Sequence, residues 1–296
     1  MDIKAIVMGL AFAFMWSSAF TSARVIVEYA PPLSALALRF LISGLIGVGI
    51  AWLLGQSARL SRRQWTGVVI FGLCQNALYL GLNFVAMQTI PASLAAIIAS
   101  TMPLLVALVG WVIFGTKVRP MGIAGLTAGV VGVVLIMGAR ISGGVDLFGL
   151  ILCMIGVISL TIATLAVMGA SSGGNVLMIV GLQMLVGAAL LAVPALALET
   201  FVVTWNWQLI VAFAYTVLVP GLAATLVWFL LVGRIGAVKA STFHFLNPFL
   251  GVAVAAILLG ESIGPLDVLG VVIIALGILA VQLSRQPPIT PRVPPV

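Results

Sequence analysis

The amino-acid sequence predicts an all-α integral membrane protein with ten transmembrane helices, arranged as two inverted-topology five-helix repeats around a central cavity. Three observations predict this fold class. Of 296 residues, 63% are hydrophobic and 6% are charged, whereas soluble domains carry about 25% charged residues. The few charges separate apolar runs long enough to cross a bilayer. The second half of the chain also repeats residues of the first.

The apolar runs between charged residues define the expected spans, since a helix needs about 20 apolar residues to cross the hydrocarbon core. Turn-forming residues divide the two longest runs, Thr89-Ile90-Pro91 in one and Ser171-Ser172-Gly173-Gly174-Asn175 in the other. The expected spans are 3–23, 33–54, 65–86, 92–113, 121–138, 147–168, 175–197, 208–231, 238–259 and 266–284. The first span is too long for a cleavable signal peptide, and the Pro-rich residues 286–296 are expected to be disordered.

The basic residues predict which ends of the spans face the cytoplasm, where short loops are enriched in Lys and Arg. If the N-terminus is cytoplasmic, the inner segments hold ten basic residues: Lys4, Arg59, Arg62, Arg63, Lys117, Arg119, Arg234, Lys239, Arg285 and Arg292. The outer segments hold only Arg24 and Arg140, and Arg39 lies inside the second span. We therefore expect both termini in the cytoplasm and the protein in the plasma (inner) membrane.

Composition argues against several other classes of protein. The formal net charge is +7, but the basic residues stand singly or in short clusters, and no nucleic-acid-binding motif is present. Cys74 and Cys153 lie in apolar runs without metal-ligand spacing, which indicates buried thiols. We therefore expect no metal or other cofactor and no nucleic-acid partner. The expected partners are a small-molecule substrate and the lipid bilayer.

The two halves of the chain, 1–140 and 141–285, are related by a shift of 145 residues. The shift places Ala92 on Ala237, Pro103 on Pro248, Gly115 on Gly260, Pro120 on Pro265, Gly125 on Gly270 and Gly132 on Gly277. With a one-residue slip, Arg39-Phe40-Leu41 falls on Gln183-Met184-Leu185. Because five helices are an odd number, the halves cross the membrane in opposite senses, as in alternating-access transporters.

The glycine and proline pattern has the form Pro103…Gly115…Pro120…Gly125…Gly132 in the first half and Asn247-Pro248…Gly260-Glu261…Pro265…Gly270…Gly277 in the second, with Trp16-Ser17-Ser18 in the first helix. Over essentially the whole chain it resembles the EamA family of the drug/metabolite transporter superfamily. The resemblance implies export of amino acids and related metabolites, or of drugs. The aromatic residues of the candidate cavity, described below, make the chain look most like the aromatic amino-acid and methyl-viologen exporters of the family. Thr116 departs from the family, which often has an acidic residue there, as at Glu261.

Polar residues within the spans are the candidate substrate-binding residues, because a polar side chain at bilayer depth is costly without a partner or water. On the third helix Gln75, Tyr79 and Asn83 follow at i, i+4 and i+8, which places them on one face. Intramembrane amides also join helices to one another. Both cavity lining and helix packing therefore remain open for these residues, although the ring of Tyr79 could stack against a substrate.

Two prolines lie at corresponding positions of the two halves. Pro103 follows Thr101 in the fourth helix, and Pro248 follows Asn247 in the ninth. Each removes a backbone donor, which predicts a kink or a local opening near the middle of the membrane. Paired breaks are typical of transporter binding sites. We expect both prolines to act as hinges and Thr101 to line the cavity.

His244, the only histidine, is expected to line the cavity and could couple transport to protons, since an imidazole titrates at about pH 6.5 in water. A neutral imidazole that only joins helices is the alternative. Glu199, Glu261 and Asp267 lie at span ends, so no span contains an acidic proton relay. This favours a facilitator slightly over a proton antiporter.

Aromatic residues complete the predicted cavity. Trp16 lies too deep for the membrane–water interface and has Ser17 beside it. The other aromatic candidates are Tyr215, Trp228 and Phe243, although such residues also face lipid. Apolar walls with a few polar anchors suit a planar amphipathic ligand. Arg39 either extends to the outer surface or presents its charge to a substrate carboxylate.

The sequence thus predicts a secondary transporter and not an enzyme. It has no ATP-binding Gly-rich loop, HExxH motif or paired nucleophile and base. The expected activity is export of neutral or aromatic amino acids, with organic cations such as methyl viologen as a further class. Exchange of phosphorylated metabolites or nucleotide sugars is one alternative, and a membrane enzyme or scaffold is another. Gly122, Gly125, Gly129 and Gly132 form a glycine stripe on the fifth helix. The stripe indicates close packing or self-association, hence a monomer or a weak homodimer.

Overall fold

The computed structural model describes residues 2–167 and 174–284. Across these ranges the chain is all-helical, and ten helical spans are long and apolar enough to cross a membrane. The protein is therefore a multi-pass membrane protein with ten spans, as the sequence predicts. The expected turn residues 171–173 and the Pro-rich residues 286–296 lie outside the described ranges.

The first five spans include three unbroken helices and two that are divided. The third span joins two α-helical segments through a π-helix, and the fourth is divided near its middle. The elements are α1 (Ile3–Tyr29), α2 (Pro32–Leu53), α3 (Arg62–Phe71), η1 (Gly72–Leu80), α4 (Gly81–Ala86), α5 (Ala92–Ser100), α6 (Met102–Val112) and α7 (Pro120–Ser142).

The second five spans repeat this plan. The eighth span contains a π-helix, and the ninth is divided by a 3-10 turn. The elements are α8 (Leu147–Val167), α9 (Val176–Leu198), α10 (Trp207–Thr216), η2 (Val217–Ala223), α11 (Ala224–Ile235), α12 (Ala237–Ser241), η3 (Thr242–Leu246), α13 (Asn247–Leu259) and α14 (Pro265–Ser284).

The end of the first helix is the one boundary that the sequence pattern placed wrongly by more than four residues. We expected the span to end at residue 23, before the charge of Arg24, but α1 continues to Tyr29. The guanidinium of Arg24 donates to the backbone carbonyl oxygens of Met87 and Gln88 at the end of the third span. A charge with such partners does not end a helix.

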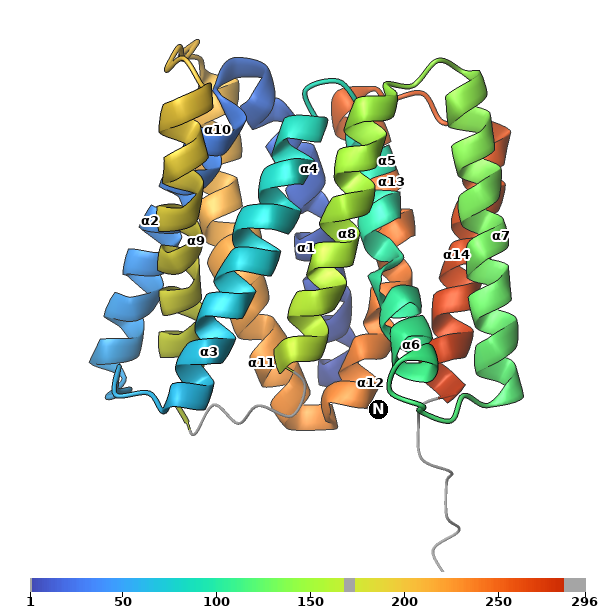
Figure 1. The fold of residues 1–296 in the computed structure, drawn as a ribbon, viewed down its shortest axis with the longest axis horizontal. Coiled ribbons are helices and arrows are strands. Elements are labelled where there is room, and N and C mark those ends of the chain that lie inside the picture. Colours follow the sequence, from blue (N-terminus) through green and yellow to red (C-terminus); the bar gives the residue numbers. More distant parts are fainter. Residues whose placement is uncertain (1, 168–173, 285–296) are drawn as a thin grey trace, which may run out of the picture.

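Helices of the two repeats pack against one another in related pairs. Helix α7 lies along α14, and α2 lies along α9; each pair contains one helix from each repeat (Figure 1). Helix α1 packs on α13, and correspondingly α8 packs on α5. Figure 1 also shows the N-terminus at the lower edge and the α7–α8 loop at the upper edge, so the repeats begin on opposite sides. This is the inverted topology that the repeat predicts.

The glycine stripe of α7 is used within the chain. A Cβ atom at Gly125 would lie 2.7 Å from the carbonyl oxygen of Gly277, and one at Gly132 would lie 2.9 Å from that of Gly270. Only glycine permits this backbone approach between α7 and α14. The stripe is therefore covered by α14 and is not a free surface for self-association.

The helix breaks are also paired between the repeats. The π-helices η1 and η2 begin at Gly72 and Val217, which the shift of 145 residues superimposes. Pro103 and Pro248, superimposed by the same shift, each occupy the first turn of a new helix, where a missing N–H costs no hydrogen bond. Both prolines thus coincide with breaks, and their role as hinges stays a prediction.

Candidate functional site

A central cavity of about 80 Å³ lies between the two repeats. Its walls come from α1, α2, η1 and α4 of the first repeat and from α9, α10, η2 and α11 of the second. The polar lining residues are Arg39, Gln75, Asn76, Tyr79, Asn83, Gln183, Thr216 and Thr225. The apolar ones are Trp16, Ala19, Phe20, Phe40, Leu80, Phe84, Met87, Met184, Pro220 and Gly221. The cavity therefore combines aromatic walls with neutral polar groups and one cation.

The third span contributes the stripe that its spacing predicts, with a local geometry that the sequence does not reveal. Gln75 and Tyr79 lie within the π-helix η1, and Asn83 follows in α4. All three line the cavity. The two π-helical segments of the described chain, η1 and η2, both contribute residues to this cavity. This fits a functional site, because π-helical turns are frequent at such sites.

Some of the lining amides hold helices together. The Asn76 side chain donates to the Gln183 carbonyl oxygen in α9 at 2.9 Å, and the Asn83 side-chain oxygen accepts from the Cys153 thiol in α8 at 3.3 Å. The Asn83 side-chain nitrogen donates within its own span, to the Tyr79 carbonyl oxygen at 2.8 Å. The Gln75 and Gln183 amides and the Tyr79 hydroxyl make no side-chain hydrogen bond with any other residue of the described ranges. These three groups are therefore available to a bound solute.

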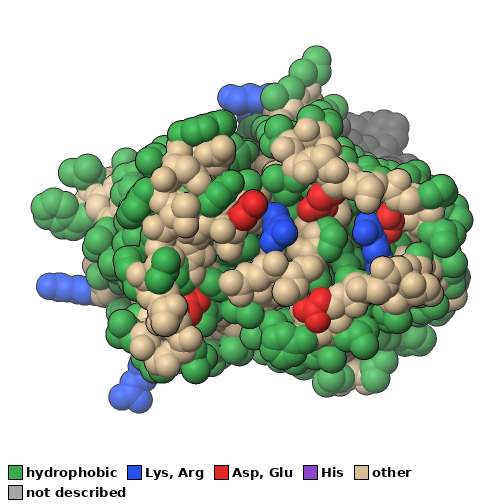
Figure 2. Space-filling model, turned by 90° about the horizontal axis from the view of Figure 1, so that it is seen from above, with side chains coloured by type: hydrophobic (Ala, Val, Ile, Leu, Met, Phe, Trp, Pro, Cys, Tyr) green, Lys and Arg blue, Asp and Glu red, His purple; other side chains and the backbone are tan. Residues whose placement is uncertain are grey.

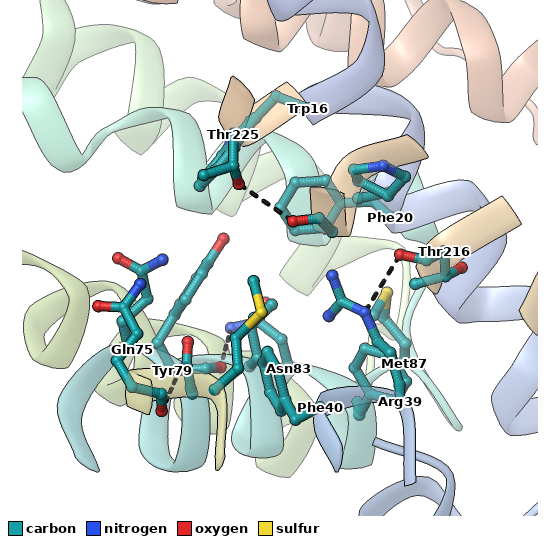
Figure 3. A pocket seen from close by; sticks show the side chains of 18 residues that line it. Trp16, Phe20, Arg39, Phe40, Gln75, Tyr79, Asn83, Met87, Thr216 and Thr225 are labelled. Atoms are coloured by element: carbon teal, nitrogen blue, oxygen red, sulfur yellow. Dashed lines mark hydrogen bonds between the residues drawn. The ribbon is translucent and has the colours of Figure 1, made fainter. Parts of the chain in front are cut away.

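Arg39 does not extend to the outer surface, contrary to one of its two expected roles. Its side chain is 6% exposed and lines the cavity. Its Nε atom donates to the carbonyl oxygen of Thr216 at 3.3 Å, and its Cζ atom lies 4.9 Å from the ring centroid of Phe40. Figure 3 shows the guanidinium and the Tyr79 ring pointing toward the same space.

A second aromatic group lies behind Trp16. The His244 ring lies 5.3 Å from that of Trp228 and 6.4 Å from that of Trp16, measured between centroids. Its Nδ1 atom lies 2.9 Å from the Asn247 side-chain nitrogen. Of these rings, only that of Trp16 reaches the cavity in this conformation. His244 and Trp228 support the wall and are absent from its lining.

The other four candidates from the sequence lie at helix contacts. Ser17 donates to the Asn247 carbonyl oxygen at 3.3 Å, Thr101 donates to that of Ile98 at 2.6 Å, and the Tyr215 hydroxyl lies 2.7 Å from that of Ser18. The ring of Phe243 packs against Gly9 in a separate apolar cluster. Each hydroxyl is thus engaged by a neighbouring helix or by its own helix, and none of these four residues lines the cavity.

Sequence reasoning missed several lining residues, above all Gln183, Thr216, Pro220 and Thr225. Gln183 carried a signal, because it is an intramembrane amide and aligns with Arg39 when the repeats are superimposed with a one-residue slip. Pro220 carried another, since it interrupts the eighth span near its middle. The two threonines carried none, because hydroxyls within spans commonly bond to their own helix.

Acidic residues gather on the face that carries the α7–α8 loop. Five of the six, Glu28, Asp146, Glu199, Glu261 and Asp267, lie at helix ends there (Figure 2). Two of them cap helices of the opposite repeat. Glu199 accepts from the backbone nitrogens of Leu33 and Ser34 at 2.7 and 2.8 Å, and Glu261 accepts from those of Ala92 and Ser93 at 2.7 and 3.0 Å. We call this the acidic face.

Hydrogen bonds lower the pKa values of two carboxyl groups outside the spans. A bond from the Thr89 hydroxyl, with a backbone bond from Gly149, lowers the pKa of Asp146 on the acidic face. On the opposite face the Asp2 side chain pairs with Arg234, and this bond together with one from the Ala5 backbone lowers the pKa of Asp2 to about 2. Both carboxylates are therefore ionised at neutral pH.

A vestibule of about 540 Å³ opens on the acidic face, lined among others by Glu28, Leu33, Gln88 and Glu199. The end of the third span separates it from the central cavity. Met87 lines the cavity and Gln88 lines the vestibule, and the Arg24 guanidinium donates to the carbonyl oxygens of both. Adjacent residues at the end of the third span, contacted by Arg24, thus line the two spaces.

Comparisons with known proteins agree with this architecture. The model of the EamA-like transporter family matches residues 3–138 and 147–283. The chain is 26% identical over 279 residues to the uncharacterized transporter YvbV of Bacillus subtilis, covering 94% of this chain and 91% of that protein. It is 26% identical over 295 residues to the uncharacterized inner membrane transporter YedA of Escherichia coli K12, covering 97% and 93%.

Two further similarities concern part of the chain and its fold. Over 140 residues the chain is 29% identical to the aromatic amino acid exporter YddG of Ancylobacter novellus, which covers 47% of this chain and 48% of that protein. A crystal structure matches with a TM-score of 0.70 and 20% identity over 96% of this chain and 98% of that chain, which shows the shared fold. Two matched repeats, ten spans and a cavity between the halves establish that this chain belongs to the EamA-like transporter family.

Proposed function

We propose that this protein is a secondary transporter that exports neutral and aromatic amino acids by alternating access, without ATP. The observation that carries the proposal is the central cavity, in which the aromatic rings of Trp16 and Phe20 face free amides and a hydroxyl. Such a site suits a planar amphipathic solute, because apolar walls bind the ring while a few polar groups fix its orientation. The cavity lies between inverted repeats, where alternating-access transporters bind their substrates.

The size of the cavity supports a moving, rather than a permanently open, pathway. At about 80 Å³ it is far smaller than the roughly 300 Å³ of a typical small-molecule pocket. A solute therefore needs the helices to separate before it can bind. Opening at the end of the third span would join the cavity to the vestibule on the acidic face, and the breaks at Pro103 and Pro248 provide places where the helices can bend.

The alternatives fit the cavity less well. Phosphorylated metabolites and nucleotide sugars need several cations to balance their phosphates, whereas Arg39 is the only Lys or Arg among the described lining residues. A membrane enzyme or a scaffold would not require a cavity shared by two inverted repeats. Organic cations such as methyl viologen remain a second candidate class, because aromatic faces attract them.

The same proposal includes an orientation for the protein. We place both termini in the cytoplasm of a cell whose plasma (inner) membrane holds the protein, with the repeats divided as 1–140 and 141–285. The basic residues then lie mainly inside and the acidic face lies outside, as the distribution of Lys and Arg favours. Cysteine accessibility labelling at Ser57 and Thr200 tests this, because the two positions lie on opposite faces. Labelling of Ser57→Cys, but not of Thr200→Cys, from outside intact cells would show that the protein has the opposite orientation.

Flux measurements in proteoliposomes test the function. The purified protein should accelerate movement of labelled phenylalanine, tryptophan or leucine without ATP, relative to empty vesicles. Trp16→Ala and Tyr79→Ala should each lower the rate, since both side chains line the cavity. Trp205→Ala is the matched control, because this tryptophan is 74% exposed in a loop. Rates equal to those of empty vesicles for every amino acid tested would overturn the proposal.

A further inference from the structure

Arg39 is a buried cation without a carboxylate partner. It is the eighth residue of α2, about 10 Å along the helix from its first residue. The ion pairs found among the described residues are Arg140 with Asp267 and Arg234 with Asp2. The six acidic residues lie at helix ends or just outside them. A charge held inside a membrane without a counterion is costly, and such charges in transporters mark substrate pathways.

The contacts of Arg39 orient its guanidinium and leave its outer end free. Nε donates to the Thr216 carbonyl oxygen at 3.3 Å, and the Phe40 ring lies beneath Cζ. The two terminal nitrogens donate no hydrogen bond to another residue of the described ranges. Figure 3 shows this end of the side chain directed into the cavity. The free edge of an arginine fork has the geometry that binds a carboxylate through two parallel hydrogen bonds.

We propose that Arg39 binds the carboxylate of the transported solute, and that the cavity selects this carboxylate and does not require an ammonium group. The inference rests on the proposed function and narrows its substrate class to aromatic or apolar monocarboxylates, amino acids included. The other lining polar groups are neutral, and no Asp or Glu lines the cavity among the described residues. A solute with an ammonium group alone would meet only the like charge of Arg39.

The same charge balance separates carboxylates from phosphates. One carboxylate neutralises one guanidinium, so the occupied cavity carries no net charge with a simple monocarboxylate, and only the charge of the solute's own ammonium group with an amino acid. A phosphate dianion would leave one negative charge without a partner, because the described lining contains no second Lys or Arg. The aromatic walls formed by Trp16 and Phe20 then hold the apolar part of the solute. By this inference methyl viologen and similar organic cations, the second candidate class of the proposed function, are not substrates.

Five compounds that share a phenyl group separate these contributions. Phenylalanine carries both charged groups, 3-phenylpropionate lacks the ammonium, and phenethylamine lacks the carboxylate. Phenylalaninamide has a neutral amide in place of the carboxylate, and phenyl phosphate has a phosphate group in its place. The readouts are flux of each labelled compound in proteoliposomes and the rise in melting temperature of the purified protein, which reports binding without transport. We expect phenylalanine and 3-phenylpropionate to bind and move, and the other three compounds to do neither.

Variants of Arg39 connect the selectivity to this side chain. Arg39→Gln should weaken binding of 3-phenylpropionate by roughly 10- to 100-fold, and Arg39→Lys, which keeps the charge without the fork, should weaken it less. Arg39→Gln removes a buried charge that has no counterion, so the melting temperature without solute should not fall. A merely structural arginine would lower it. Arg59→Gln, which removes an exposed charge, is the matched control.

The outcomes are distinct. Binding of phenethylamine as strong as that of 3-phenylpropionate, or unchanged selectivity in both Arg39 variants, overturns the inference and leaves amino-acid transport standing. Movement of 3-phenylpropionate without movement of any amino acid supports the inference and overturns the amino-acid assignment. Binding of phenyl phosphate in preference to the carboxylates overturns the inference in favour of phosphorylated solutes. No binding and no flux with any of the five compounds overturns both.

Discussion

The guanidinium of Arg140 donates two hydrogen bonds to the carboxylate of Asp267, at 3.0 and 2.9 Å. The pair joins the end of α7 to the start of α14 and so connects the last helices of the two repeats on the acidic face. Asp267 also accepts from the backbone nitrogen of Gly264 at 2.9 Å. One carboxylate therefore holds both a turn and an inter-repeat contact, in a place that is partly shielded from water.

Replacing Asp267 by Asn should lower the free energy of unfolding by about 1–3 kcal/mol, because it leaves a partly buried arginine without its charged partner. Thermal or denaturant unfolding in detergent measures the loss. Glu28→Gln is the control, since that exposed carboxylate on the same face has no ion-pair partner among the described residues. Equal stability of the Asp267 and Glu28 variants would show that the pair contributes nothing.

The two capping glutamates should differ in their contribution to stability. Glu199 accepts three hydrogen bonds at the start of α2, including one from the Ser34 hydroxyl at 2.7 Å, whereas Glu261 accepts two at the start of α5. Replacement of either by Gln removes charge from a helix N-terminus and should cost about 0.5–2 kcal/mol. We expect the larger loss for Glu199→Gln. A larger loss for Glu261→Gln would contradict this ranking.

Close backbone packing between α7 and α14 predicts a sharp contrast between two glycines. A Cβ atom at Gly277 would lie 2.7 Å from the Gly125 carbonyl oxygen and 3.0 Å from the Gly129 nitrogen, so Gly277→Ala must push the helices apart. We expect a loss of about 1–3 kcal/mol. Gly138→Ala in α7 is the control, since a Cβ atom there meets no atom within 4 Å. Melting temperatures of both variants in detergent decide the matter, and similar values would refute the packing argument.

His244 should not couple transport to protons. It lies behind Trp16, in contact with Asn247, and not in the cavity lining. Amino-acid flux should therefore respond to the solute gradient and not to an imposed pH gradient, and His244→Gln should leave the pH profile of flux unchanged. Flux driven by a pH gradient in the wild-type protein and lost in His244→Gln would establish proton coupling instead.

The general architecture followed from the sequence because the bilayer imposes simple rules on it. Spans are readable from the spacing of charges, and the shift of 145 residues that aligns Pro103 with Pro248 also gives the inverted repeat. Four of the ten proposed cavity residues, Trp16, Gln75, Tyr79 and Asn83, line the central cavity. The three polar residues could be chosen because they share one helix face and are costly in lipid, and Trp16 because it lies too deep for the membrane–water interface.

The other proposed positions show where this reasoning stops. Tyr215 and Thr101 are as polar as Tyr79 in the sequence, but each hydroxyl has a protein neighbour in bonding range. A polar residue within a span can thus line a cavity or join two helices, and its place in the sequence does not distinguish the two roles. The π-helical turns of η1 and η2 were not predicted either, because they depend on which backbone groups neighbouring helices leave free.

The sequence alone determined that the chain crosses the membrane ten times and that its halves are inverted copies, since hydropathy, charge and repetition are properties of the chain. Only the tertiary structure decided that Arg39 turns inward and that Glu199 and Glu261 cap helices of the other repeat. The partners of these side chains lie 166 to 177 positions away along the chain or in the cavity, and a linear pattern does not specify such distant contacts.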